Sequence, residues 1–117
     1  MKNLMGIVWD RKFFHDNDLQ QSIADICTWE KKPILNIVDA YRIMKQNGPV
    51  GTSIADTAEL KALILSPNIV AIDTAAVKLF NQVQAMELDA VGHIGAGEEL
   101  NLGTTDLEKL NIKRINL

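Results

Sequence analysis

Cysteine is almost absent from this sequence, since Cys27 is the one thiol in 117 residues. A single cysteine cannot form an internal disulfide, and it cannot supply the thiolates that hold an iron–sulfur cluster. The chain therefore has no iron–sulfur ligand set of its own, and a reducing cytoplasm is the simplest compartment for it. Cys27 follows Ile26 on the apolar side of an expected helix, which disfavours a reactive Cys–His pair with His15 or His93.

Long apolar runs and basic stretches are also lacking. No run approaches the ~18 apolar residues of a membrane-spanning helix, and the N-terminus lacks the long apolar region of a signal peptide. The formal net charge is −3 and the lysines and arginines are scattered, whereas a nucleic-acid-binding surface usually carries a basic stripe. We therefore expect neither a membrane nor a nucleic acid as partner.

Signatures of familiar enzyme chemistry are missing as well. The sequence contains no G-x-S-x-G elbow, no P-loop, no H-E-x-x-H and no C-x-x-C motif. The glycines Gly92, Gly95 and Gly97 do not have the spacing of the dinucleotide fingerprint. The two histidines, His15 and His93, lack the spacing of metal ligands. The sequence indicates no reaction, and whether the chain is an enzyme stays open.

The composition is that of a folded chain. Hydrophobic residues make up 47% and charged residues 23% of the sequence, which is typical of globular proteins. At this length the chain has room for one domain with a buried core. We expect a single α/β domain over residues 1–117, a compact layered fold in which three to four strands form a mixed or mostly parallel sheet packed by helices.

The stretch from residue 60 to residue 80 organises this expected fold. Leu60–Leu65 is a short apolar run, which predicts a strand covered on both faces. Ser66 then fits a helix N-cap, with Pro67 at the first helical position. The apolar spacing that follows predicts a helix over residues 69–80.

Asp73 lies in the middle of the apolar face of that helix, together with Ile69, Ile72, Ala76 and Phe80. A carboxylate there is partly desolvated, so it should accept hydrogen bonds, pair with a cation or have a raised pKa. In one interpretation, the Asp73 carboxylate belongs to a functional site. The other is a structural carboxylate that caps backbone groups of a neighbouring loop.

Caps and helix breakers predict the remaining elements. Asp18 and Gln21 form a capping-box pattern for a helix over residues 19–29, and Pro33 ends it. Residues 35–38 predict a short strand that ends at Asp39. We further expect a short uncapped helix near residues 4–8, a loop over 11–15, a helix or an extended segment over 40–46, a loop or edge strand over 52–57, a helix over 87–99, a helical turn capped by Thr105 with Glu108, and an edge strand over 112–117.

Several polar residues stand at the expected ends of these elements. Asp39 follows a strand, and ligands of open α/β sheets bind outside the carboxyl ends of strands, although a turn-forming or capping role fits equally. Asn47 and Gly48 begin the strongest loop signal, N-G-P-V-G, whose glycines allow backbone approach to a ligand but also occur in plain surface loops. His93 fits a base or ligand, or an exposed or packed histidine.

Four motifs occur in a fixed order along the chain: K-N-L-M-G at residues 2–6, L-N-I-V-D-A at 35–40, N-G-P with a further glycine at 47–51, and S-P-N-I-V-A-I-D at 66–73. Over roughly residues 1–100 the chain resembles the C-terminal part of the domain of unknown function 362 family. Members of that family are typically longer, and many carry ferredoxin-like modules with four-iron, four-sulfur clusters. The resemblance implies a fragment or C-terminal half of a larger family domain, in a redox-associated protein of unestablished activity.

Two functions are compatible with these residues. In the first, the chain is the small-ligand- or metal-binding part of a redox-associated protein. Asp39 and Asp73 are then metal ligands or a general base, Lys2 contacts an anion, and the loop over residues 47–51 is a lid. The candidate ligand-binding residues are Lys2, Asn3, Asp39, Asn47, Gly48 and Asp73.

In the second function, the chain is a non-catalytic interaction domain. It would pack on a partner chain, on the missing N-terminal portion of the family domain, or on a second copy as a homo-oligomer. The expected exposed patch of Trp9, Phe13 and Phe14 favours this hypothesis, because exposed apolar patches often mark interfaces.

Overall fold

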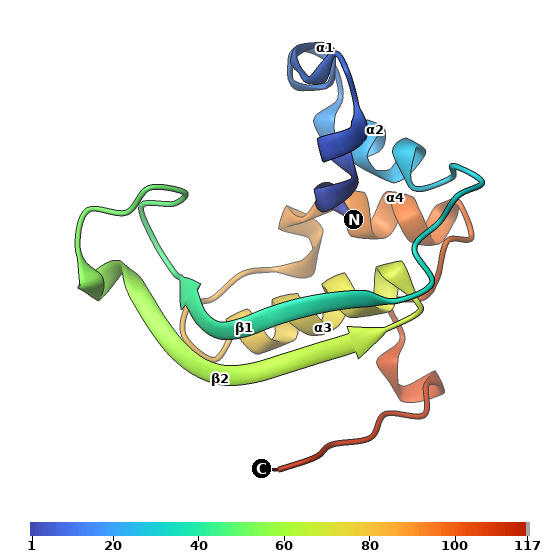
Figure 1. Cartoon of the computed structure of the whole chain (residues 1–117). Coiled ribbons are helices and arrows are strands. Elements are labelled where there is room, and N and C mark those ends of the chain that lie inside the picture. The colour runs from blue at the N-terminus through green and yellow to red at the C-terminus, as the bar shows by residue number, and fades with distance from the viewer. Residues whose placement is uncertain (117) are drawn as a thin grey trace.

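Helices and strands are mixed along the chain in the computed structural model, which describes residues 1–116 (Figure 1). Two strands pair into one small sheet, and short 3-10 helices, labelled η, connect the larger elements. In chain order the elements are η1 (Lys2–Ile7), α1 (Arg11–Asp16), α2 (Leu19–Ile26), β1 (Asn36–Met44), η2 (Ile54–Asp56), β2 (Thr57–Ser66), α3 (Ile69–Phe80), η3 (Leu88–Ala90), α4 (Gly92–Glu99) and η4 (Leu107–Lys109).

The sheet is smaller than the sequence predicts. β1 and β2 pair antiparallel, and within residues 1–116 no other strand joins them. The prediction of three to four strands in a mixed or mostly parallel sheet is therefore wrong. Residues 112–116, the expected edge strand, are not in a strand, and residue 117 lies outside the described range. Residues 54–56 form η2 in place of an edge strand.

β1 is longer than predicted. It continues through Asp39 to Met44, so most of the ambiguous segment over residues 40–46 is extended. Asp39 consequently lies inside a strand and not at its carboxyl end. Pairing explains the difference: Met44 lies opposite Thr57 at the start of β2, and cross-strand partners outweigh a weak local preference.

A β-bulge interrupts the ladder. The register shifts between Ala40 and Arg42, where β2 advances three residues while β1 advances two. Lys61 at this point has a φ of 49°, a left-handed conformation that is uncommon for residues other than glycine. Bulges bend a strand and increase its twist, and both strands curve in Figure 1.

One face of the sheet is covered. In Figure 1 the strands lie in front of α3, which contacts both of them. Ala40 points toward this inner face and is buried, whereas Leu63 and Leu65 on the opposite, outer face are more than half exposed. The run Leu60–Leu65 is thus covered on one face, and the prediction of a strand covered on both faces is wrong.

α3 has the predicted bounds, Ile69–Phe80, but its cap differs from the prediction. The side chain of Asn68 accepts a hydrogen bond from the backbone N of Ala71 at 2.9 Å, as an N-cap residue does. Ser66 instead accepts from the backbone N of Asn68 at 3.0 Å, and Pro67 precedes the cap. Asparagine and serine are both good caps, so the sequence alone does not choose between them.

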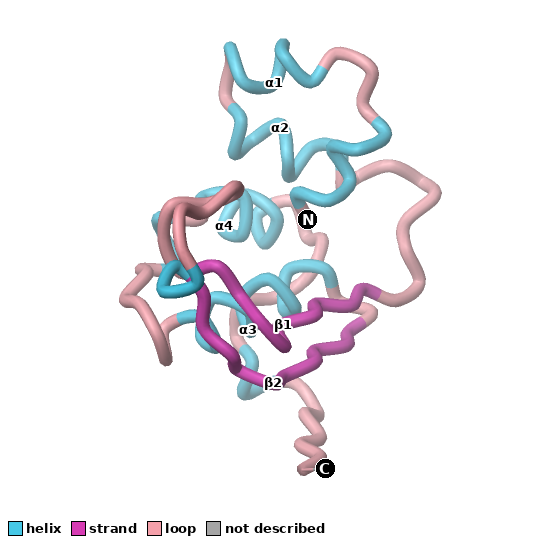
Figure 2. Tube along the Cα trace, turned by 60° about the vertical axis from the view of Figure 1, so that its left-hand side comes forward, coloured by secondary structure: helices cyan, strands magenta, loops and turns pink. Residues whose placement is uncertain are grey.

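A helical layer above the sheet holds most of the core. Figure 2 shows α1, α2 and α4 stacked in that order above the sheet and α3. The Asp18 side chain accepts from the backbone N of Gln21 at 3.0 Å, which confirms the predicted start of α2. Ile23 on α2 and Ile94 on α4 have no exposed surface, because these two helices pack against each other.

Gly97 lets the N-terminus approach this layer closely. A Cβ at this position would lie 2.6 Å from Cε of Met1 and 3.1 Å from Cγ2 of Val70. Both separations are shorter than ordinary van der Waals contact, so a side chain at this position would force Met1 and Val70 to move. The missing side chain of Gly97 therefore allows α4 to pack closely against the N-terminus and α3.

Three local predictions for the helical parts are wrong. Residues 11–15 form α1 and not a loop, because the Asp10 side chain caps the backbone N of Phe13 at 3.1 Å. The helix expected over residues 87–99 is divided into η3 and α4 at Val91, whose φ and ψ of −110° and 64° are not helical. η4 is capped by Asp106 and not by Thr105.

None of the helices in residues 1–116 has both the length and the apolar content for crossing a membrane.

Candidate functional site

Asp73 lies where α3, α4 and the N-terminus meet. Its Oδ2 accepts a hydrogen bond from the N-terminal ammonium of Met1 at 2.8 Å and lies 3.4 Å from Nε2 of His93. The Asp73 side chain is 19% exposed, and Met1 as a whole residue is 4% exposed. A carboxylate so largely removed from water needs such partners.

The partners of Asp73 set its charge. Burial by itself raises the pKa of the carboxyl, because it disfavours the charged form. The contact with His93 and the charge and hydrogen bond of the Met1 ammonium outweigh burial, so the pKa of Asp73 is below its usual value. Asp73 is therefore ionised at neutral pH and holds the three segments together.

Gln20 on α2 positions His93. Its Oε1 accepts a hydrogen bond from the backbone N of His93 at 3.0 Å and lies 2.8 Å from Nδ1 of the ring. A carbonyl oxygen only accepts, so Nδ1 is the donor and Nε2 faces Asp73. Of the interpretations that the sequence left open for His93, the structure shows a packed histidine with two defined partners.

An apolar pocket of about 260 Å³ lies beside this pair. Asp73 and His93 line part of it, and the other walls come from α3, α4 and the segment between them. Apolar walls with a few polar groups are the usual arrangement of a small-molecule site, although most such sites exceed about 300 Å³. The remaining lining residues are Ala76, Val77, Phe80, Met86, Val91 and Ile94.

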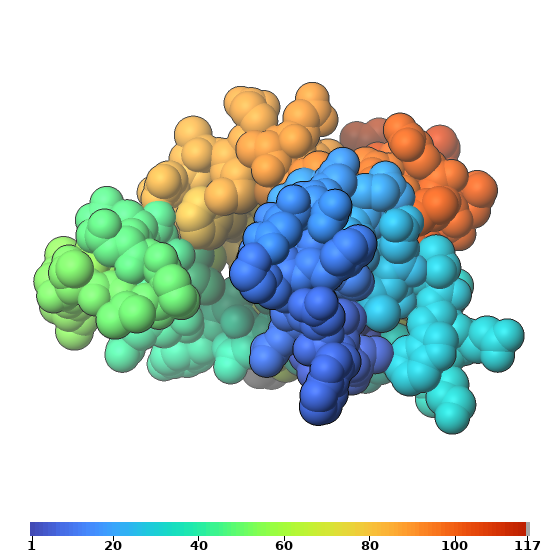
Figure 3. Space-filling view, turned by 90° about the horizontal axis from the view of Figure 1, so that it is seen from above, coloured from blue at the N-terminus to red at the C-terminus, as the bar shows by residue number. Residues whose placement is uncertain are grey.

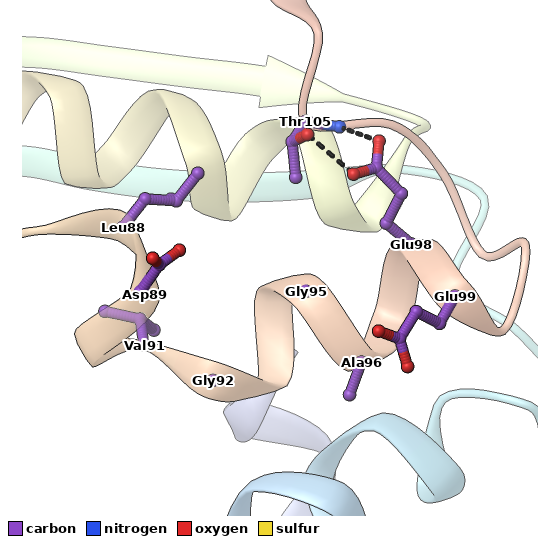
Figure 4. Close-up of a pocket in the computed structure, with 9 residues that line it drawn as sticks. All are labelled: Leu88, Asp89, Val91, Gly92, Gly95, Ala96, Glu98, Glu99 and Thr105. Atoms are coloured by element: carbon purple, nitrogen blue, oxygen red, sulfur yellow. Dashed lines mark hydrogen bonds between the residues drawn. The ribbon is translucent and has the colours of Figure 1, made fainter.

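A second pocket of about 410 Å³ lies along α4 (Figure 4). Both carboxylate oxygens of Glu98 bind Thr105, which also lines the pocket: Oε1 accepts from its backbone N at 2.7 Å and Oε2 from its hydroxyl at 2.7 Å. These bonds hold the pKa of Glu98 below its usual value. Figure 4 shows Asp89 and Glu99 at separate ends of the pocket, so its carboxylates do not converge on one point.

Asp56 organises the loop between β1 and β2 and is not among the candidate residues predicted from the sequence. The buried carboxylate accepts from the backbone N of Thr52 at 2.6 Å, the backbone N of Ser53 at 3.0 Å and Nδ2 of Asn47 at 2.8 Å. The Thr52 hydroxyl and the Gln46 amide also donate to it. The backbone hydrogen bonds, chiefly, hold the pKa of Asp56 well below its usual value.

A sequence signal for this arrangement was present. Ser53 and Asp56 have the spacing of a capping box, and the structure contains both reciprocal hydrogen bonds. The side-chain amide of the candidate residue Asn47 donates a hydrogen bond to Asp56. The candidate Gly48 is exposed, and its peptide bond to Pro49 is cis. In Figures 1 and 3 this loop, coloured green, stands at one end of the molecule.

The other candidate residues lie elsewhere. Asp39 is exposed on the outer face of the sheet, because its neighbour Ala40 faces α3 and successive side chains of a strand alternate. Its Oδ1 accepts from the backbone N of Tyr41 at 2.9 Å, beside the bulge. Lys2 and Asn3 are exposed on η1. The structure therefore does not bring Asp39 to Asp73.

The described residues offer no ready metal centre. Nowhere in residues 1–116 do three or more His, Cys, Asp or Glu side chains gather in a way that could hold a metal ion. The strongest titratable cluster is the pair of Asp73 and His93. Asp73 belongs to α3 and His93 to α4, so the pair forms only where these two helices pack against each other.

The comparisons with known proteins assign a family. Neither the curated proteins nor the solved structures contain a significant match to the chain. A family model described as Domain of unknown function (DUF362) matches residues 1–78, two thirds of the chain. The matched region contains Gln20, Asp39, Asn47 and Asp73, and it ends within α3, before His93. The chain belongs to the DUF362 family.

Proposed function

We propose that this chain is a non-catalytic interaction domain that packs the outer face of its sheet against another polypeptide, either a further part of the family domain or a separate chain. One observation carries the proposal. Large apolar side chains on the outer face are each between 50% and 60% exposed. They are Leu35, Ile37, Tyr41, Leu63 and Leu65.

These side chains share one face of the sheet, on which Asp39 lies between Ile37 and Tyr41. Ile37 lies directly opposite Leu65 in the register, and Asp39 lies opposite Leu63. Opposite residues of an antiparallel pair lie on the same face, with Cβ atoms about 5 Å apart. A sheet face in contact with water normally carries polar side chains. A sheet face with exposed apolar side chains therefore indicates a surface that another polypeptide covers.

The patch expected around Trp9 supports the proposal less well. Trp9 is fully exposed and Phe13 is more than half exposed. Phe14, however, packs against the core. The aromatic residues therefore do not form the single surface that the sequence suggested, and the outer face of the sheet is the better candidate.

Replacing both Ile37 and Leu63 with lysine tests the proposal. The wild-type chain is expected to self-associate weakly as its concentration rises, and the Ile37→Lys, Leu63→Lys variant is expected to stay monomeric. Its free energy of unfolding should change by no more than about 0.5 kcal/mol for each exposed site. Sedimentation velocity over a concentration series measures the association, and circular dichroism measures unfolding.

Trp9→Lys is the matched control, because it removes an exposed apolar side chain outside the outer face. It should leave the association unchanged. Association that persists unchanged in the double variant, or that Trp9→Lys weakens as strongly as the double variant does, would contradict the proposal.

A second candidate function is the binding of a small ligand beside Asp73 and His93. The apolar pocket at this pair favours it, because a carboxylate and an imidazole can together accept or donate a proton at one end of an organic ligand. For a divalent cation the same pair supplies two side-chain ligands, since Asp39 faces the other side of the sheet.

Thermal-shift measurements test this candidate. The probes are divalent cations and small aromatic or aliphatic acids and amines, since a ligand that binds the folded chain raises its Tm. A shift at this site should disappear in His93→Gln and persist in His15→Gln, which changes an exposed histidine on α1. Absence of any shift, or a shift that survives in His93→Gln, would eliminate this function.

A further inference from the structure

We propose that Asn47 is a site of spontaneous deamidation, in which water converts the side-chain amide to a carboxylate, and that the Asp56 carboxylate slows this reaction in the folded chain. The modification places two carboxylates next to each other and opens the loop between β1 and β2. The proposal concerns the N-G-P-V-G segment, to which the interaction function assigns no role.

The sequence favours this reaction at Asn47 over every other asparagine. The chain has nine asparagines, and Asn47 alone is followed by glycine. Six of the others precede leucine or isoleucine, whose branched side chains hinder approach to the backbone nitrogen. Glycine has no side chain, so the backbone nitrogen of Gly48 is open to approach. Both residues are exposed, and the reaction therefore has access to water.

The reaction is a hydrolysis without a redox step. The backbone nitrogen of Gly48 loses its proton and attacks Cγ of Asn47, so that a C–N bond forms. The bond between Cγ and Nδ2 breaks, and Nδ2 takes up a proton and leaves as ammonia. The product is a cyclic succinimide. Water then adds to one or the other carbonyl of the succinimide and opens the ring, which gives aspartate or isoaspartate at position 47.

The folded loop holds the group that must leave. Nδ2 of Asn47 donates a hydrogen bond to Oδ1 of Asp56 at 2.8 Å, and a carboxylate only accepts, so the amide nitrogen is the atom that faces it. Hydrogen bonds from the Thr52 and Ser53 backbone hold the pKa of Asp56 well below its usual value. The acceptor is therefore charged at neutral pH. Ammonia leaves only after this charge-assisted hydrogen bond breaks.

A second contact fixes the peptide group that carries the attacking nitrogen. The backbone carbonyl of Asn47 accepts a hydrogen bond from the backbone N of Gly51 at 2.8 Å. This carbonyl and the backbone nitrogen of Gly48 belong to one planar peptide group. Rotation of that group toward Cγ disturbs the hydrogen bond from Gly51. Deamidation therefore proceeds from the opened loop, and the frequency of local opening sets its rate.

The product of the reaction destabilises the closed loop. A carboxylate at position 47 accepts hydrogen bonds where the amide donated one, and it faces the Asp56 carboxylate at hydrogen-bond distance. Two like charges at this separation repel each other. Isoaspartate also adds a carbon to the backbone, which changes the course of the loop. We expect the loop to open more readily after the reaction than before it.

The test follows deamidation of the full chain at mildly alkaline pH, where the backbone nitrogen loses its proton more readily. Peptide mapping by mass spectrometry measures the rate at each asparagine, and chromatography separates aspartate from isoaspartate. The same chain unfolded in urea gives the rate without the loop structure. Gly48→Ala is the matched control, because a Cβ there lies 3.4 Å from Sδ of Met44, which the folded loop accommodates.

In urea, Asn47 should react faster than any other asparagine. Folding should slow this reaction by at least about tenfold, and Asp56→Ala should restore about tenfold of the rate in the folded chain. The increase should be confined to Asn47, because global unfolding of the variant would accelerate the other asparagines as well. Gly48→Ala should slow the reaction both in the folded chain and in urea.

The product is tested separately with Asn47→Asp. Hydrogen exchange of the Thr52 and Ser53 amides should accelerate in this variant, and unchanged exchange would contradict the opening of the loop. Equal rates at Asn47 in the folded and the unfolded wild type would show that the loop does not protect the amide. An unchanged rate in Asp56→Ala would remove Asp56 from the protection. Faster reaction at another asparagine in urea would overturn the assignment of the site.

Discussion

Replacing Asp73 with alanine is expected to lower the free energy of unfolding by about 2–3 kcal/mol. The substitution leaves the buried Met1 ammonium and the His93 ring facing each other without the carboxylate between them. Breaking a fully buried ion pair costs about 3–5 kcal/mol, and the 19% exposure of the Asp73 side chain reduces that cost. Urea denaturation followed by circular dichroism measures the change.

Asp89→Ala is the control, because Asp89 is an exposed carboxylate on η3. It should change the free energy of unfolding by no more than about 0.5 kcal/mol. If Asp73→Ala costs no more than Asp89→Ala, the ion pair contributes nothing to stability, and the junction is held by apolar packing alone.

The contribution of Asp73 should also depend on pH. Its pKa is lower in the folded chain than its usual value, so folding favours the ionised form. The stabilisation is therefore fully present above about pH 4, near the usual pKa of an aspartate, and it is lost as the pH falls through the folded-state pKa. The stability difference between the wild type and Asp73→Asn should accordingly shrink below about pH 4, and a constant difference would contradict the assignment.

Replacing Asp56 with alanine should release the loop between β1 and β2. The carboxylate accepts hydrogen bonds from two backbone N–H groups and three side chains, and alanine leaves all of these donors without a partner. Hydrogen exchange of the Thr52 and Ser53 amides should accelerate about tenfold or more, because their protection depends on these bonds.

The conservative variant Asp56→Asn should have a smaller effect. Its single side-chain carbonyl can still accept some of the hydrogen bonds, while the charge is lost. Amide exchange in α2, which lies in the helical layer, should be unchanged in both variants. Unchanged exchange of Thr52 and Ser53 in Asp56→Ala would mean that the neighbouring turns hold the loop without the carboxylate.

Local sequence patterns determined several parts of this protein. The helical spacing of apolar residues correctly predicts the bounds of α3. The capping-box pattern at Asp18 correctly predicts the start of α2. The same spacing put Asp73 on an apolar face, where it is indeed largely buried and paired. Family membership likewise followed from the order of short motifs. Each of these helix features, and each single motif, depends on residues within a few positions of one another.

The tertiary structure decided the rest, because it depends on contacts between residues far apart in the sequence. An apolar run such as Leu60–Leu65 predicts a strand, but it does not specify how many strands pair with it or whether one face stays uncovered. Asp39 was expected at a strand end, and pairing with β2 extended the strand beyond it. The contacts of Asp73 with Met1 and His93 arise from the packing of α4 against α2 and α3, which no local pattern encodes.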